Sequence, residues 1–190
     1  MNPADRSALA DLGYTEEWLS AGVLDREQLA DQHRRFESGG TRKTSRYRSQ
    51  TVSAWLARDE PLDSARVDAF LALLAADPDP KLARRSVADL VQSPRIDLDL
   101  LDHIVQRDPA ILKRHEALIR RTYLTRRLDQ GITDELIQLL IDDRDTAIQT
   151  RLIRDTRLSR KHAELLAKAG ANPTIREKSQ AWFQDKKFWK

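Results

Sequence analysis

The chain contains no cysteine, six glycines, seven prolines and only 6% aromatic residues. Without cysteine it cannot form a disulfide, an iron–sulfur cluster or a zinc site with thiolate ligands. So few glycines and prolines argue against long disordered tracts. Its apolar runs span a few residues, whereas a helix that crosses a membrane needs about 20. We therefore expect no membrane association. Asp5, Arg6 and Asp11 interrupt any signal-peptide core, which predicts a cytoplasmic location.

Charge is what the chain has in quantity, since charged residues make up 33% of the sequence and hydrophobic residues 40%. This balance is low in apolar residues for a compact sphere. It suits a thin, layered structure in which each helix buries a single apolar stripe. No alternating apolar pattern continues for long enough to predict a strand. The composition therefore predicts an all-α fold.

Start signals for helices recur along the chain. Thr15 and Asp25 each precede acidic or amide residues that suit a first helical turn, which predicts helices over about 15–21 and 25–37. Residues 38–46, SGGTRKTSR, are typical of a flexible basic connection. Further helices are expected to begin near Tyr47, Asp63, Pro80, Asp97, Ile111, Thr133, Asp145, Ser159 and Pro173.

An Asp-Pro or Asn-Pro pair opens several of these helices. The Asp or Asn side chain accepts hydrogen bonds from free amides of the first turn, where proline is also favourable. The pairs are Asp79-Pro80, Asp108-Pro109 and Asn172-Pro173, with Asp145-Thr146 in an equivalent place. Their intervals of 29, 37 and 27 residues describe a degenerate repeat. We therefore expect about 10–11 helices in antiparallel pairs, an α-solenoid, with a compact irregular bundle as the alternative.

The segment 73–85, LLAADPDPKLARR, resembles the interhelical turn of HEAT-like repeats and of the leucine-rich-repeat-variant family. In those repeats an Asp-Pro-Asp turn precedes a helix containing Val-Arg. The resemblance extends over about residues 62–183, with one good copy and three weaker ones. The repeats here are longer and more variable, and the cysteines that hold a cluster in the founding type are absent. The resemblance implies an architecture used for partner binding, nucleic-acid binding and base-excision chemistry, without choosing among them.

The charge pattern divides the chain into an N-terminal acidic helical segment with its basic linker, residues 1–45, and a helical-repeat domain, residues 46–190. Residues 1–37 contain 4 Lys or Arg against 8 Asp or Glu, and residues 111–190 contain 18 against 11, although the net charge is only +3. Such asymmetry attracts an acidic partner or a nucleic acid.

No catalytic or metal-binding pattern is present in the sequence. The four histidines, His33, His103, His115 and His162, fall in different expected helices and lack the spacing of a metal-binding face. Asp102 and His103 are neighbours on one helix and therefore point apart. No glycine-rich phosphate loop or nucleophile elbow occurs. We expect a protein that is not an enzyme and has no cofactor.

Basic residues recur along the long helix that begins near Ile111. Because seven residues make about two helical turns, residues at that spacing stay on one side. If the first helices of successive pairs line one surface, the cations form a positive stripe; in the alternative, they pair with nearby carboxylates. The candidate partner-binding cations are Lys113, Arg114, Arg120, Arg121, Arg127, Arg151 and Arg154.

The C-terminus places four aromatic residues within a short stretch. Trp182 and Phe183 are expected to cap the last apolar stripe. Phe188 and Trp189 lie beyond the expected helix and either fold back or anchor a partner. The sequence thus favours a non-enzymatic interaction or scaffold module that binds an acidic protein. The alternative is a nucleic-acid-binding repeat protein, including one of the DNA-glycosylase type.

Overall fold

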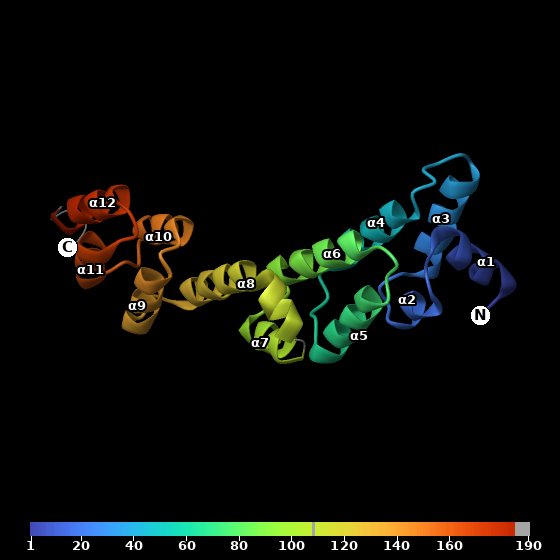
Figure 1. Ribbon diagram of the computed structural model, residues 1–190, viewed down its shortest axis with the longest axis horizontal. Helices are drawn as coiled ribbons and strands as arrows, with labels where there is room; N and C mark the ends of the chain where they lie inside the picture. The colour runs from blue at the N-terminus through green and yellow to red at the C-terminus, as the bar shows by residue number, and fades with distance from the viewer. Residues whose placement is uncertain (108, 185–190) are drawn as a thin grey trace. The chain divides into compact units, whose positions relative to one another are not determined.

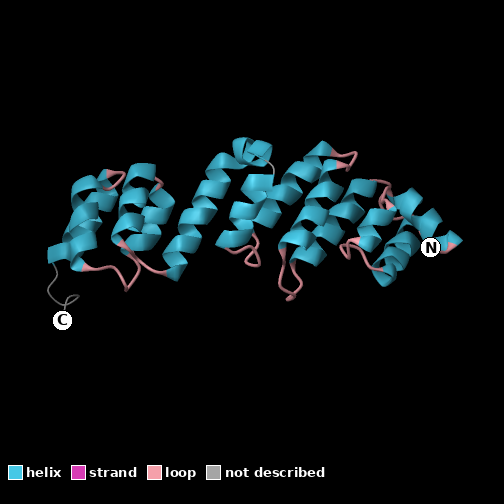
Figure 2. Cartoon of the chain, turned by 90° about the horizontal axis from the view of Figure 1, so that it is seen from below, coloured by secondary structure: helices cyan, strands magenta, loops and turns pink. Residues whose placement is uncertain are grey.

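The computed structural model describes residues 1–107 and 109–184 (Figure 1). Within these ranges the chain is all-helical and contains no strand, which confirms the all-α part of the predicted fold (Figure 2). The chain forms two compact units, residues 1–114 and 115–190. The domain boundary that we predict from charge, between residues 45 and 46, falls inside the first of these units.

The first unit contains seven helices and the start of an eighth. Within α8 the backbone at His115 leaves the helical conformation, with φ −124° and ψ 22°, where the second unit begins. The helices are α1 (Pro3–Leu12), α2 (Glu16–Ser20), α3 (Arg26–Glu37), α4 (Thr44–Leu56), α5 (Ser64–Ala75), α6 (Pro80–Gln92), α7 (Leu98–Arg107) and α8 (Pro109–Gln130).

Helix α1 is the element that the sequence reasoning misses. It brings the helices of the described residues to twelve, where 10–11 are predicted. Its start repeats the signal recognised elsewhere, since Asn2 precedes Pro3 and the Asn2 side chain accepts a hydrogen bond of 2.6 Å from the amide of Asp5. Helix α4 begins at Thr44, so the connection before it is shorter than predicted. Thr15 lies at the N-cap of α2, but its side chain accepts no amide hydrogen bond there.

The core of the first unit joins the N-terminal helices to α4 and α5. Helix α1 contacts α3 and α4. The rings of Trp55 and Phe70 stack with centroids 4.5 Å apart, and both side chains are buried. The buried hydroxyl of Tyr14 donates to Gln32 and also contacts Thr51, both at 2.7 Å. Residues 1–45 therefore share a core with the helices that follow them.

The second unit contains the rest of α8 and four further helices, α9 (Asp134–Asp143), α10 (Thr146–Ile153), α11 (Arg160–Ala169) and α12 (Pro173–Gln184). Side-chain caps fix their starts where the sequence predicts them, as at Asp145, which accepts the amides of Ala147 and Ile148. Helices α11 and α12 pack along each other, and α10 also contacts α12. The fully buried core side chains include Leu128, Ile137, Leu152 and Leu166.

Contacts between helices two positions apart recur within each unit. Helix α4 contacts α6 and α5 contacts α7 in the first unit, while α9 contacts α11 and α10 contacts α12 in the second. None of the described helices combines the length and the apolar character needed to cross a membrane.

Candidate partner-binding site

Two arginines of the predicted basic stripe on α8 form ion pairs within the second unit. Arg120 forms an ion pair with Asp143 at the end of α9. Arg121 donates from Nε to Asp145, the N-cap of α10, at 2.7 Å. Burial raises the pKa of the Asp145 carboxyl. The hydrogen bonds from Arg121 and from the two amides that Asp145 caps lower this pKa by more than burial raises it, so it lies below the ordinary value. These two arginines therefore bind the turn between α9 and α10.

Three other predicted cations also have partners nearby. Arg127 lies over the ring of Tyr123 at 5.9 Å and donates to its hydroxyl at 3.2 Å. Arg151 forms an ion pair with Asp129, and Arg114 donates from Nε to the carbonyl of Ala110 at 3.1 Å.

Lys113 and Arg154 differ from these, because both are exposed and no described carboxylate pairs with either. Phe188 and Trp189 lie outside the described residues. Trp182 and Phe183 pack against the core of the second unit, as expected of a terminal cap, and the Arg160 guanidinium lies 5.0 Å from the centre of the Phe183 ring.

Arg154 borders a cavity of about 60 Å³ between α10 and the start of α12. Thr150 is on α10 and Arg154, four residues later, is the C-cap of that helix. Thr174 and Lys178 are one turn apart on α12. Ile153 and Ile175, whose exposed fractions are 4% and 2%, also line the cavity. We call this site, lined by Thr150, Ile153, Arg154, Asn172, Thr174, Ile175 and Lys178, the α10–α12 cavity.

Two of the five polar side chains that line the α10–α12 cavity are already used inside the chain. The Thr150 hydroxyl donates to the carbonyl of Thr146 at 2.6 Å, and the Asn172 side chain accepts the amide of Ile175 at 2.9 Å. Arg154 and Lys178 remain as the cations of this lining, and neither has a carboxylate partner among the described residues. The cavity thus combines an apolar floor with a cationic rim.

A second basic depression lies near the end of α11 and the start of α12. It is lined by Arg144, Lys168 and Arg176, together with Asp142. Lys168 is paired with Glu164 at 2.6 Å, and Asp142 accepts a hydrogen bond from Gln138 at 2.9 Å. Arg144 and Arg176 thus add positive charge near the N-terminal end of α12.

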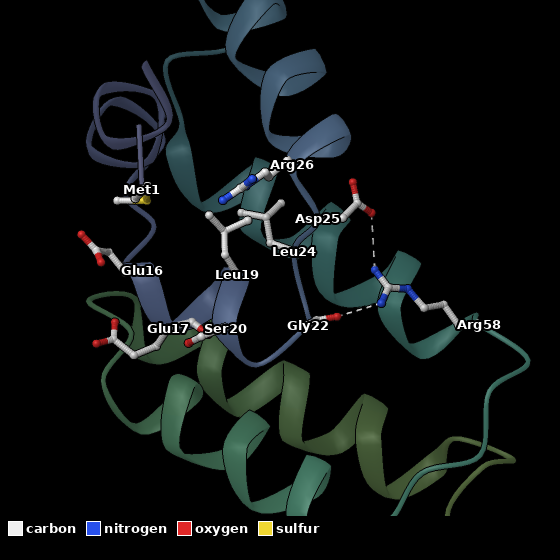
Figure 3. A pocket seen from close by; sticks show the side chains of 10 residues that line it. All are labelled: Met1, Glu16, Glu17, Leu19, Ser20, Gly22, Leu24, Asp25, Arg26 and Arg58. Atoms are coloured by element: carbon white, nitrogen blue, oxygen red, sulfur yellow. Dashed lines mark hydrogen bonds and ion pairs between the residues drawn. The ribbon is translucent and has the colours of Figure 1, made fainter. Parts of the chain in front are cut away.

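The first unit contains a larger cavity of about 690 Å³ beside α2 (Figure 3). Arg58 closes one side, donating to the carbonyl of Gly22 at 2.7 Å and lying 3.6 Å from Asp25. Arg26, another lining residue, lies 3.5 Å from Asp5. A hydrogen bond from the Thr15 hydroxyl lowers the pKa of the lining carboxyl of Glu17, which makes it a poor proton donor. The two arginines that line this cavity, Arg26 and Arg58, are thus both held by groups of the first unit.

Three histidines link helices two positions apart, a role that the sequence reasoning does not predict. His33 on α3 contacts Asp11 on α1 at 2.9 Å, His103 on α7 contacts Asp68 on α5 at 2.9 Å, and His162 on α11 contacts Asp134 on α9 at 2.8 Å. No group of three or more His, Asp or Glu among the described residues is placed to hold a metal ion. The four histidines are irregularly spaced, at positions 33, 103, 115 and 162, so their spacing carries no signal that could have found these links.

Sequence reasoning identifies Arg154 as a candidate but misses Lys178, Arg144 and Arg176. Their grouping depends on which face of α12 packs against α10 and α11, and this is a tertiary property. Comparison of the chain with protein-family models, with curated proteins and with solved structures gives no match in any of the three.

Proposed function

We propose that this chain is a non-enzymatic interaction module that binds an acidic segment of a partner protein through the basic rim of the α10–α12 cavity. The observation that carries the proposal is the pair of cations, Arg154 and Lys178, that border one cavity without a carboxylate partner among the described residues. A cation that its own chain does not neutralise keeps its charge available to a ligand.

We further propose that the helices are HEAT-like repeats arranged as an α-solenoid within each unit. The contacts between helices two positions apart, α4 with α6 and α10 with α12, support this arrangement, because stacked repeats place equivalent helices side by side. The three histidine links between helices two positions apart support it as well. Solenoids of this kind present extended binding surfaces and need no catalytic residues.

The ion pairs of α8 favour the α10–α12 cavity over the part of the predicted stripe that lies on α8. A ligand that binds Arg120 or Arg121 has to compete with Asp143 or Asp145 for the same guanidinium group. A ligand at Arg154 and Lys178 has no such competitor among the described carboxylates. The proposal therefore moves from the long helix to the last helices of the second unit.

Titration of the full chain with a fluorescent Glu- and Asp-rich peptide tests this function. We expect Lys178→Glu to weaken binding about tenfold, and Arg154→Glu likewise, because each replaces an attraction with a repulsion. Lys113→Glu is the matched control, since it changes the net charge equally at an exposed cation that does not line the cavity. Equal losses in all three variants would show non-specific attraction and contradict the proposal.

A parallel titration with single- and double-stranded nucleic acid covers the other class of acidic ligand. Tighter binding to nucleic acid than to the peptide, with a steep loss of affinity as salt increases, would replace the proposal with nucleic-acid binding. Loss of peptide binding in Arg127→Glu, but not in Lys178→Glu, would place the site on α8 instead.

A further inference from the structure

We infer that the α10–α12 cavity takes an aliphatic side chain of the partner, so that the recognised segment is an aliphatic residue flanked by acidic ones. This inference rests on the proposed function and specifies its ligand. It follows from three properties of the cavity: its floor, its size and the position of its charges.

The floor of the cavity is apolar. Ile153 on α10 and Ile175 on α12 line it, and both are almost fully buried. The Thr150 hydroxyl and the Asn172 side chain are engaged by Thr146 and Ile175, so neither requires a polar ligand. An apolar group that enters loses contact with water and gains contact with the two isoleucines.

The size of the cavity sets the size of the group. Its volume is about 60 Å³, whereas a single water molecule needs about 10–15 Å³. The space therefore corresponds to a few heavy atoms, which suits the branched end of valine, leucine or isoleucine. An aromatic ring is too large to enter without displacement of the lining.

The charges of the cavity lie at its rim rather than on its floor. Arg154 directly follows Ile153, the last residue of α10, and Lys178 is three residues after Ile175 on α12. Both side chains belong to the lining, and neither has a described carboxylate partner. A peptide whose aliphatic residue enters the cavity brings its neighbouring residues to these cations, where carboxylates form charge-assisted hydrogen bonds.

Two peptides of equal charge separate this inference from the function on which it rests. One carries a central leucine between Glu and Asp residues, and the other carries asparagine in that place. We expect the leucine peptide to bind the full chain about tenfold more tightly, because a buried leucine side chain adds affinity that asparagine does not supply. Equal affinities would overturn the inference but leave the function standing, whereas no binding of either peptide would overturn both.

A variant that fills the cavity gives the second measurement. Thr150→Leu places a larger side chain in the lining, and Thr156→Leu is the control, since Thr156 is exposed and outside the lining. We expect Thr150→Leu to abolish the preference for leucine while it leaves the affinity for the asparagine peptide unchanged. An unchanged preference in Thr150→Leu, with a melting curve that shows a folded protein, would contradict the inference.

Discussion

At the scale of single residues, Arg48 and Asp77 form a buried ion pair. The side chains are exposed by 3% and 0%, and Arg48 Nε donates to Asp77 at 2.8 Å. Arg48 also donates to the carbonyls of Leu12 and Gly13, both at 3.3 Å. A Cβ atom at Gly13, whose φ is 71°, would lie 2.5 Å from the guanidinium. The pair thus fixes the end of α1 against α4.

Replacement of Arg48 by methionine should destabilise the chain strongly. It leaves the Asp77 carboxylate buried without its cation, which costs about 3–5 kcal/mol of unfolding free energy. Arg66→Met is the control, because Arg66 pairs with Glu60 at the surface and an exposed pair contributes about 0–1 kcal/mol. Denaturant unfolding of both variants measures the difference. A loss for Arg48→Met as small as that of the control would show that the pair does not hold α1.

Tyr14 predicts a loss of stability at alkaline pH. Burial raises the pKa of Tyr14 from 10.0 to about 12, although the hydrogen bonds with Thr51 and Gln32 oppose the shift. Because the folded chain retains this proton after the unfolded chain releases it, stability is complete below about pH 10 and falls as the pH rises toward 12. Unfolding curves across this range should show the decrease in the wild type and less of it in Tyr14→Phe. The same slope in both proteins would exclude Tyr14 as the cause.

At the scale of elements, hydrogen bonds between side chains hold α9 and α11 together. Asp134, in the first turn of α9, accepts from Lys161 and pairs with His162 on α11 at 2.8 Å. The hydrogen bond from the Lys161 ammonium, followed by that from the His162 ring, holds the pKa of the Asp134 carboxyl below its ordinary value. The carboxylate is therefore the favoured form in the folded chain.

The contribution of Asp134 to stability should disappear in acid. A carboxyl whose pKa is lowered by folding stabilises the chain above its unfolded pKa, about 3.9, and the contribution is lost as the pH falls through the lower folded value. The denaturant concentration at half unfolding should decrease as the pH is lowered from about 5 to about 3. This decrease should be less steep in Asp134→Asn than in the wild type. Asp99→Asn, at an exposed carboxyl outside this link, should retain the wild-type slope. If stability decreases equally steeply with pH in all three proteins, the contacts of Asp134 with Lys161 and His162 do not contribute to it.

Local sequence signals predict where the helices begin, whereas the contacts between helices depend on tertiary packing. The caps at Asp25, Asp63 and Asp145 lie where the sequence places them, because a cap depends on residues within one turn. The pairing of Arg120 with Asp143 could not be predicted, since it depends on how α8 is rotated against α9. For the same reason the sequence could not group Lys178 with Arg154.

At the scale of the whole molecule, the chain consists of two units that differ in their charged groups. The first unit holds the buried Arg48 and Asp77 pair and the mixed-charge cavity beside α2. The second has the cations around the start of α12 that its own described carboxylates do not neutralise. Under the proposed function, the first unit contributes stability and the second contributes recognition.

The central claim, that an acidic segment binds at the α10–α12 cavity, is tested most directly by NMR of the labelled full chain titrated with the leucine-containing acidic peptide. The account predicts that the largest amide shift changes fall on residues 150–154 and 172–178, and that Lys178→Glu needs about tenfold more peptide to reach them. Changes concentrated on residues 113–127 or within residues 1–107, or none at a peptide excess, would contradict it.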